Sequence, residues 1–185
     1  NTNNTSYEYR LAGLDAIKQD VQNMFLSYLN FTEYNSAYYQ KIIQLLSDYI
    51  TEDSNSKYNQ ILKKIILKKL QLSSNTFWNE MLSWLYIQQK QHKKALTQEK
   101  AIFQRNQKSL QRIIDLAILA SNEKAYDVSA SAFNFIINKA QDSKLILEAK
   151  RRLLILELVS FDSPDYKQIQ LDYICLLYTS DAADD

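Results

Sequence analysis

Histidine, cysteine and closely spaced carboxylates supply most of the chemistry of enzyme active sites, and this chain has few of them. His92 is the only histidine and Cys175 the only cysteine. A metal site needs several nitrogen, sulfur or oxygen ligands in tight spacing, and nucleophilic catalysis needs a base beside the nucleophile. No such cluster surrounds His92 in the sequence. We therefore expect a structural role for His92.

The other common catalytic patterns are equally weak. Phosphate-binding loops need glycines where the backbone approaches the nucleotide, and Gly13 is the only glycine. The carboxylates are spread along the chain without the paired spacing of a shared acid and base. The sequence predicts no catalytic residue, no metal site, no cofactor and no small-molecule substrate. We expect a protein that is not an enzyme.

Lysines are the most concentrated charged residues, and they could contact nucleic acid or anionic lipid. A solvated helix face is the preferred interpretation, because the net charge is small, +1 for the whole sequence and about +4 without its last eleven residues, and acids such as Glu80 and Glu99 dilute the positive field. Weak nucleic-acid binding is kept as an alternative function. The residues concerned are Lys63, Lys64, Lys68, Lys69, Lys90, Lys93, Lys94 and Lys100.

The elements that position these residues are predicted to be helices. Hydrophobic residues make up 46% of the chain and charged residues 23%. With one glycine and one proline, the chain has almost no residues suited to positive-φ turns or rigid kinks. Apolar residues recur at three- and four-residue steps, as Ile61, Leu62, Ile65 and Ile66 do. No apolar run is long enough for a membrane span. We predict an all-α fold with helices at about 14–30, 36–50, 56–71, 76–89, 92–105, 109–121, 124–139, 143–160 and 165–174.

The last eleven residues form a separate segment. Residues 175–185 have the residue order that a transposase sequencing adapter encodes when it is translated, and we interpret them as a non-native tail. Without the three aspartates of this tail the net charge becomes about +4. We expect the natural chain to continue beyond both ends of this sequence.

An internal repeat with a period of about 34 residues appears in the second half of the chain. Leu116 and Ala117 repeat the pattern of Leu82 and Ser83 at this offset. Small residues at these positions are expected to let the two helices of each hairpin approach closely. The full first set is Leu82, Ser83, Tyr86, His92, Ala95 and Ile102, and the second is Leu116, Ala117, Ala120, Tyr126, Ser129, Phe133 and Ile136.

The spacing and order of these residues resemble the tetratricopeptide repeat, whose first helix carries a Leu-Gly pair and a Tyr. A third copy is placed at Leu156, Tyr166, Ile169 and Tyr173, with Glu157 where a small residue belongs. The resemblance covers 76–174 and implies a solenoid of helical hairpins, while 1–75 is a divergent helical region. Residues 82–96 further resemble long tetratricopeptide proteins of Bacteroidota-type bacteria. That resemblance implies a bacterial scaffold in the cytoplasm or the cell envelope.

In this family the first helices of the hairpins line a concave groove that binds protein or peptide. The resemblance therefore implies a non-catalytic repeat scaffold with an unknown protein or peptide partner. The alternatives are a structural arm that positions modules outside this chain, or ordinary packing of the same apolar residues against neighbouring helices. The groove positions carried over are Glu80, Trp84, Ile87, Gln88, Ile114, Ile118, Asn122, Leu154 and Leu158.

Overall fold

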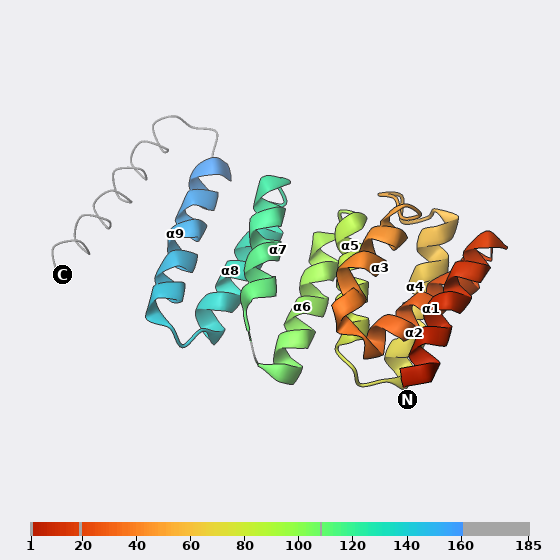
Figure 1. The fold of residues 1–185 in the computed structure, drawn as a ribbon. Helices are drawn as coiled ribbons and strands as arrows, with labels where there is room; N and C mark the ends of the chain where they lie inside the picture. The colour runs from red at the N-terminus through yellow and green to blue at the C-terminus, as the bar shows by residue number, and fades with distance from the viewer. Residues whose placement is uncertain (1, 19, 108, 161–185) are drawn as a thin grey trace. The chain divides into compact units, whose positions relative to one another are not determined.

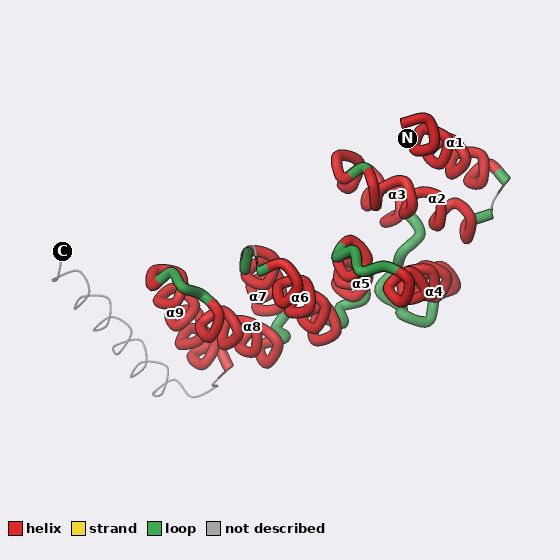
Figure 2. Tube along the Cα trace, turned by 90° about the horizontal axis from the view of Figure 1, so that it is seen from below, coloured by secondary structure: helices red, strands yellow, loops and turns green. Residues whose placement is uncertain are grey.

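The computed structural model describes residues 2–18, 20–107 and 109–160. Within these ranges the chain is all-helical, without a strand, which confirms the all-α part of the prediction (Figures 1 and 2). The elements are α1 (Thr2–Ile17), α2 (Val21–Tyr34), the 3-10 helix η1 (Ser36–Tyr38), α3 (Tyr39–Ser47), α4 (Lys57–Leu72), α5 (Phe77–Gln88), α6 (His92–Asn106), α7 (Gln111–Asn122), α8 (Tyr126–Lys139) and α9 (Ser143–Ser160).

The chain divides into two compact units, Asn1–Arg105 and Asn106–Asp185. Unit 1 holds the elements from α1 to α6, and unit 2 holds α7, α8 and α9. The division falls inside the stretch 76–174 that carries the sequence repeat. The predicted helix 165–174, most of the third repeat copy and the tail 175–185 lie outside the described residues.

The predicted single helix at 14–30 is wrong, because the chain breaks between α1 and α2. Asp20 caps α2: its carboxylate accepts hydrogen bonds from the backbone N–H of Asn23 at 3.2 Å and from the Asn23 side chain at 2.8 Å. An N-cap carboxylate satisfies donors that the first turn of a helix leaves unpaired. The helical hydrophobic pattern runs through this break, so periodicity alone did not reveal it.

Aromatic rings hold α1 against α2 and η1. The ring of Tyr9 on α1 lies 5.2 Å from that of Phe31 on α2, which in turn lies 4.9 Å from Tyr38 on η1, measured between centroids. Tilted and edge-on pairs at these distances are favourable arrangements of aromatic quadrupoles. The Lys41 ammonium group lies 5.2 Å above the Tyr9 ring and adds a cation–π contact.

Asn59 on α4 fixes the polar loop that precedes this helix. Its side chain is fully buried and donates to the carbonyl oxygens of Thr51 and Asp53, at 2.7 Å each, while its own oxygen accepts from the Thr51 N–H at 3.2 Å. A buried amide with these bonds satisfies loop groups that would otherwise lack partners. The loop is therefore anchored to α4 despite its polar sequence.

The turn between α5 and α6 has a defined geometry. Lys90 adopts a left-handed conformation with φ of 54°. The N–H of Gln91 donates to the Tyr86 carbonyl at 2.8 Å, and the N–H of Lys90 donates to the Ile87 carbonyl at 2.9 Å. These two bonds define a Schellman motif, which satisfies the last carbonyls of α5 and reverses the chain.

The turn between α7 and α8 repeats this geometry one repeat period further along the chain. Lys124 is left-handed with φ of 62°, the Ala125 N–H donates to the Ala120 carbonyl at 2.8 Å, and the Lys124 N–H donates to the Ser121 carbonyl at 3.0 Å. The offset from Lys90 to Lys124 equals that of the sequence repeat. Two hairpins, one in each unit, therefore share the same turn.

Glycine is the residue that best tolerates the left-handed position of such a turn, since it has no Cβ. We expect Lys124→Gly to stabilise unit 2 by about 0.5–1 kcal/mol, measured as a shift in chemical denaturation. Lys124→Ala is the matched control: it removes the charge but keeps the Cβ, and it should bring no comparable gain. Equal effects of the two substitutions would contradict this explanation.

The small residues of the repeat lie at the centre of each hairpin. Ser83 and Ala95 in unit 1, and Ala117 and Ser129 in unit 2, are fully buried. The Ser129 hydroxyl donates to the Ala117 carbonyl at 2.8 Å, which requires that α7 and α8 nearly touch. This contact confirms the close approach predicted for the second hairpin. In unit 2 the helices α7, α8 and α9 run alternately up and down (Figure 1), and α8 packs against both neighbours.

Candidate functional site

The groove residues predicted in unit 1 all lie on α5. Glu80, Trp84, Ile87 and Gln88 are half-buried and are spaced so that they share one face of the helix. Trp78, by contrast, is completely buried. The α5 helix therefore has a core side and a side of intermediate exposure that includes all four predicted positions.

The groove residues predicted in unit 2 lie on α7 and α9. Ile114 and Ile118 are half-buried and Asn122 is exposed, at successive four-residue steps along α7. On α9, Leu154 is half-buried and Leu158 is buried. Leu158 thus presents little surface to a partner, whereas the other four positions keep part of theirs.

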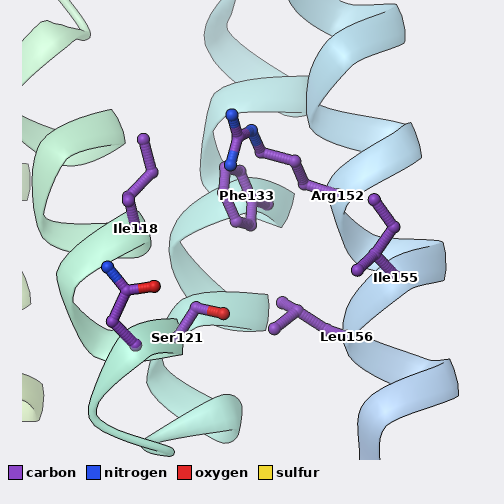
Figure 3. Close-up of a pocket in the computed structure, with 7 residues that line it drawn as sticks. Ile118, Ser121, Phe133, Arg152, Ile155 and Leu156 are labelled. Carbon is purple, nitrogen blue, oxygen red and sulfur yellow. The ribbon is translucent and has the colours of Figure 1, made fainter.

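A small open pocket of about 70 Å³ lies in unit 2 between α7 and α9, with α8 behind it (Figure 3). It brings together two of the predicted positions, Ile118 and Asn122, but not Leu154 or Leu158. Five of its residues were not assigned to the groove by sequence reasoning. The lining residues are Ile118, Ser121, Asn122, Phe133, Arg152, Ile155 and Leu156.

Sequence reasoning left these pocket residues out of the groove for two reasons. Phe133 is buried, with 2% of its surface exposed, as expected of the hairpin core, yet it also forms part of the pocket wall. Arg152 and Ile155 lie on α9, where the third repeat copy follows at a longer offset than the second and the transfer of positions is least direct. The i,i+3 and i,i+4 spacing of Arg152, Ile155 and Leu156 on one helix face was the available signal.

Arginine supplies the charge at this pocket. The Nε of Arg152 donates to Glu148 Oε1 at 2.8 Å, and Arg151 contacts both oxygens of the same carboxylate, at 3.0 and 3.1 Å. Glu148 therefore neutralises one of two adjacent guanidinium groups. None of the seven residues that line the pocket is acidic. Arg152 is the one charged residue among the seven that line the pocket.

The size of the pocket limits what it can hold. Pockets for drug-sized ligands have volumes of about 300–1,000 Å³, so 70 Å³ accommodates one side chain rather than a whole ligand.

Among the described residues no group of three or more histidine, cysteine, aspartate or glutamate side chains is arranged to hold a metal ion. No helix in these ranges is long and apolar enough to cross a membrane.

His92 begins α6 and is buried, with 5% of its surface exposed. The equivalent residue of the next hairpin, Tyr126, begins α8 and is half-buried. His92 and Tyr126 therefore occupy the same place in the two hairpins.

Glu99, one of the two acids expected to dilute the lysine field, is buried rather than exposed. Only 3% of its surface is exposed, and its carboxylate accepts a hydrogen bond from the Ser83 hydroxyl at 2.5 Å. The position corresponds to Phe133, one repeat period later in the next hairpin. The repeat places position 99 in the core whatever its residue type, so the first hairpin has a buried polar contact where the second has a phenylalanine.

Further polar contacts join α5 and α6 near Glu99. Asn79 donates to the Gln98 side chain at 2.9 Å and accepts from Arg105 at 2.8 Å. Asn79 is itself buried, with 5% of its surface exposed. These bonds hold the second helix of the first hairpin against the first through side-chain polar groups.

Several of the lysines lie over aromatic rings. The ammonium groups of Lys63 and Lys94 lie 5.8 and 5.6 Å from the centroid of the Tyr86 ring, and that of Lys69 lies 5.4 Å from Trp78. Burial raises the pKa of Tyr86, which keeps this phenol neutral at physiological pH. The lysine contacts to it are therefore cation–π interactions rather than ion pairs.

No family model, curated protein or solved structure matches this chain.

Proposed function

We propose that this protein is a non-catalytic, tetratricopeptide-type repeat scaffold that binds a segment of another protein on the faces that the first helix of each hairpin presents within its own unit. One observation carries the proposal. The Schellman turns at Lys90 and Lys124 have the same hydrogen bonds and lie one repeat period apart. Identical turns at the period of the sequence repeat are typical of hairpin solenoids.

The α5 face in unit 1 and the α7 face in unit 2 each support the binding role. Trp84 and Ile118 are half-buried side chains on the first helix of each hairpin. Large apolar residues that keep part of their surface in a ring of polar groups are common at sites of peptide recognition. Glu80, Gln88 and Asn122 provide such polar neighbours on the same helix faces.

The test is a selection of random dodecapeptides on the purified chain, followed by affinity measurements on variants by fluorescence anisotropy. We expect enriched peptides whose affinity falls at least tenfold on Trp84→Ala or Ile118→Ala, because truncation of an interface anchor costs about 2 kcal/mol or more. Asn134→Ala, at an exposed position of α8, is the control and should leave the affinity unchanged.

Circular dichroism must first show that each variant remains folded. Peptides that bind folded Trp84→Ala and Ile118→Ala as tightly as the parent chain would rule out these helix faces as the binding surface. The absence of any enriched peptide would contradict the scaffold proposal itself.

A further inference from the structure

Positive charge is concentrated on the second half of unit 1. Residues 57–105 contain ten lysines and arginines and two glutamates, whereas the rest of the chain has more acidic than basic residues. The helices α4, α5 and α6, with their turns, thus carry a formal excess of eight positive charges. A local excess of this kind produces a positive surface field even though the whole chain is nearly neutral.

The exposed faces of α4 and α6 carry this charge without any acidic residue. No exposed residue of either helix is aspartate or glutamate. Glu80 is half-buried on α5, and the buried Glu99 of α6 accepts the hydrogen bond from Ser83. The exposed basic residues of the two helices are Lys57, Lys64, Lys68, Lys93, Lys94 and Arg105.

Lysines and glutamines share the outer face of α4. They follow one another at three- and four-residue steps, which place them in one row along the helix. The exposed leucines of α4, Leu67 and Leu72, flank this row on opposite sides. The centre of the face is therefore polar, which favours a nucleic-acid strand over the apolar interior of a membrane. The row consists of Lys57, Gln60, Lys64, Lys68 and Gln71.

The basic residues of α4 and α6 meet on one side of α5, which lies between these helices (Figure 2). The ammonium groups of Lys63 and Lys94 both lie less than 6 Å from the centroid of the Tyr86 ring. The two charges are therefore no more than about 12 Å apart. Side-chain stems that rest on a ring hold the charged groups at the surface.

This side of unit 1 is separate from the proposed peptide-binding face. Successive residues of a helix point about 100° apart, so Tyr86 points about 200° away from Trp84. Lys63 and Lys94 contact α5 at Tyr86 and not at the half-buried face that includes Trp84. A ligand of the lysines and a ligand of the α5 face would thus bind on nearly opposite sides of α5.

We infer that the exposed faces of α4 and α6 bind nucleic acid through its phosphate backbone. Lysine ammonium groups attract phosphates, and the glutamine amides beside them can hydrogen-bond to phosphates and sugars. No exposed residue of α4 or α6 is aromatic, so bases have no stacking platform on these faces. The binding therefore depends on charge and not on base sequence. This activity goes beyond the proposed function and uses a different surface.

The test is fluorescence anisotropy on the purified chain with labelled oligouridylate, oligoadenylate and a DNA duplex, each about 20 nucleotides long and thus long enough for several phosphate contacts. We expect the two homopolymers to bind with similar affinities, since phosphates carry no sequence information. For about five contacted phosphates of a single strand, the slope of log affinity against log salt should be about −3 to −4. The duplex shows whether the faces also accept a double-stranded backbone.

The decisive variant combines Lys64→Gln, Lys68→Gln and Lys93→Gln. We expect at least tenfold weaker binding of oligouridylate at low salt and a salt slope smaller in magnitude by about 2, because three phosphate contacts are lost. The matched control combines Lys139→Gln, Lys144→Gln and Lys150→Gln, which removes the same charge from exposed positions of unit 2. This control should keep most of the affinity. Circular dichroism verifies that both variants are folded.

Equal losses of affinity in the two triple variants would overturn the inference, and so would an absence of oligonucleotide binding by the parent chain. Vesicles of phosphatidylcholine and phosphatidylserine test the membrane alternative. Vesicle binding without oligonucleotide binding would assign the lysines to a membrane surface instead. Trp84→Ala should leave the affinity for oligouridylate unchanged, so this inference and the peptide-binding proposal can fail separately.

Discussion

Trp78→Ala is expected to lower the free energy of unfolding of unit 1 by about 3–5 kcal/mol, the usual cost of deleting a large buried aromatic side chain. Trp78 is fully buried, and its indole Nε1 donates to Glu33 Oε1 at 2.9 Å. The substitution therefore leaves a cavity and removes a hydrogen bond between α2 and α5. A domain stability of only about 5–15 kcal/mol makes this loss severe.

Trp84→Ala provides the comparison within the same helix. Trp84 is half-buried, so its truncation should cost less, about 1–2 kcal/mol. Both tryptophans of the chain lie on α5, so tryptophan fluorescence reports on unit 1, and each variant keeps one of them as a probe. Equal losses for the two variants would place Trp84 in the core and would remove it from the proposed binding surface.

Phe133→Ala is expected to destabilise unit 2 by a similar amount, about 3–5 kcal/mol. Phe133 is buried on α8, where it meets the pocket between α7 and α9. Its removal enlarges that pocket into a cavity in a unit described by only three helices. Denaturation followed by circular dichroism measures the loss, because the fluorescence of α5 does not report on unit 2.

Two substitutions control this result. Phe133→Leu keeps most of the apolar volume and should cost less than Phe133→Ala. Phe135→Ala removes a half-buried ring from the same helix and should also cost less. If Phe135→Ala were the more destabilising of the two alanine variants, the assignment of Phe133 to the hairpin core would fail.

The hairpins were largely predictable from the sequence, whereas the N-terminal region was less so. Helical periodicity and small residues at the repeat offset predicted the close contact of α7 and α8, which the Ser129 hydrogen bond confirms. The break before α2 was missed because an N-cap such as Asp20 can stand inside a continuous apolar pattern. Capping depends on a few local bonds, which periodicity does not detect.

The candidate site divides in a similar way. The family resemblance placed Ile118 and Asn122 in the predicted groove, and both line the pocket. Arg152 was missed because it lines the pocket only where α9 lies opposite α7, and the sequence of α9 does not specify that neighbour. The burial of Glu99 could have been predicted from its equivalence to Phe133, but its charge suggested a surface position.

The sequence by itself determined that the described chain is helical and that two hairpins share one period, since both properties depend on residues close together along the chain. Tertiary structure decided which side chains meet. Phe133, Ile118 and Arg152 form one pocket only because α7, α8 and α9 pack side by side, and Glu99 is a core residue only because α5 covers it. Burial in the pocket arises from contacts between helices. Hydrophobic periodicity indicates only which face of each helix is covered.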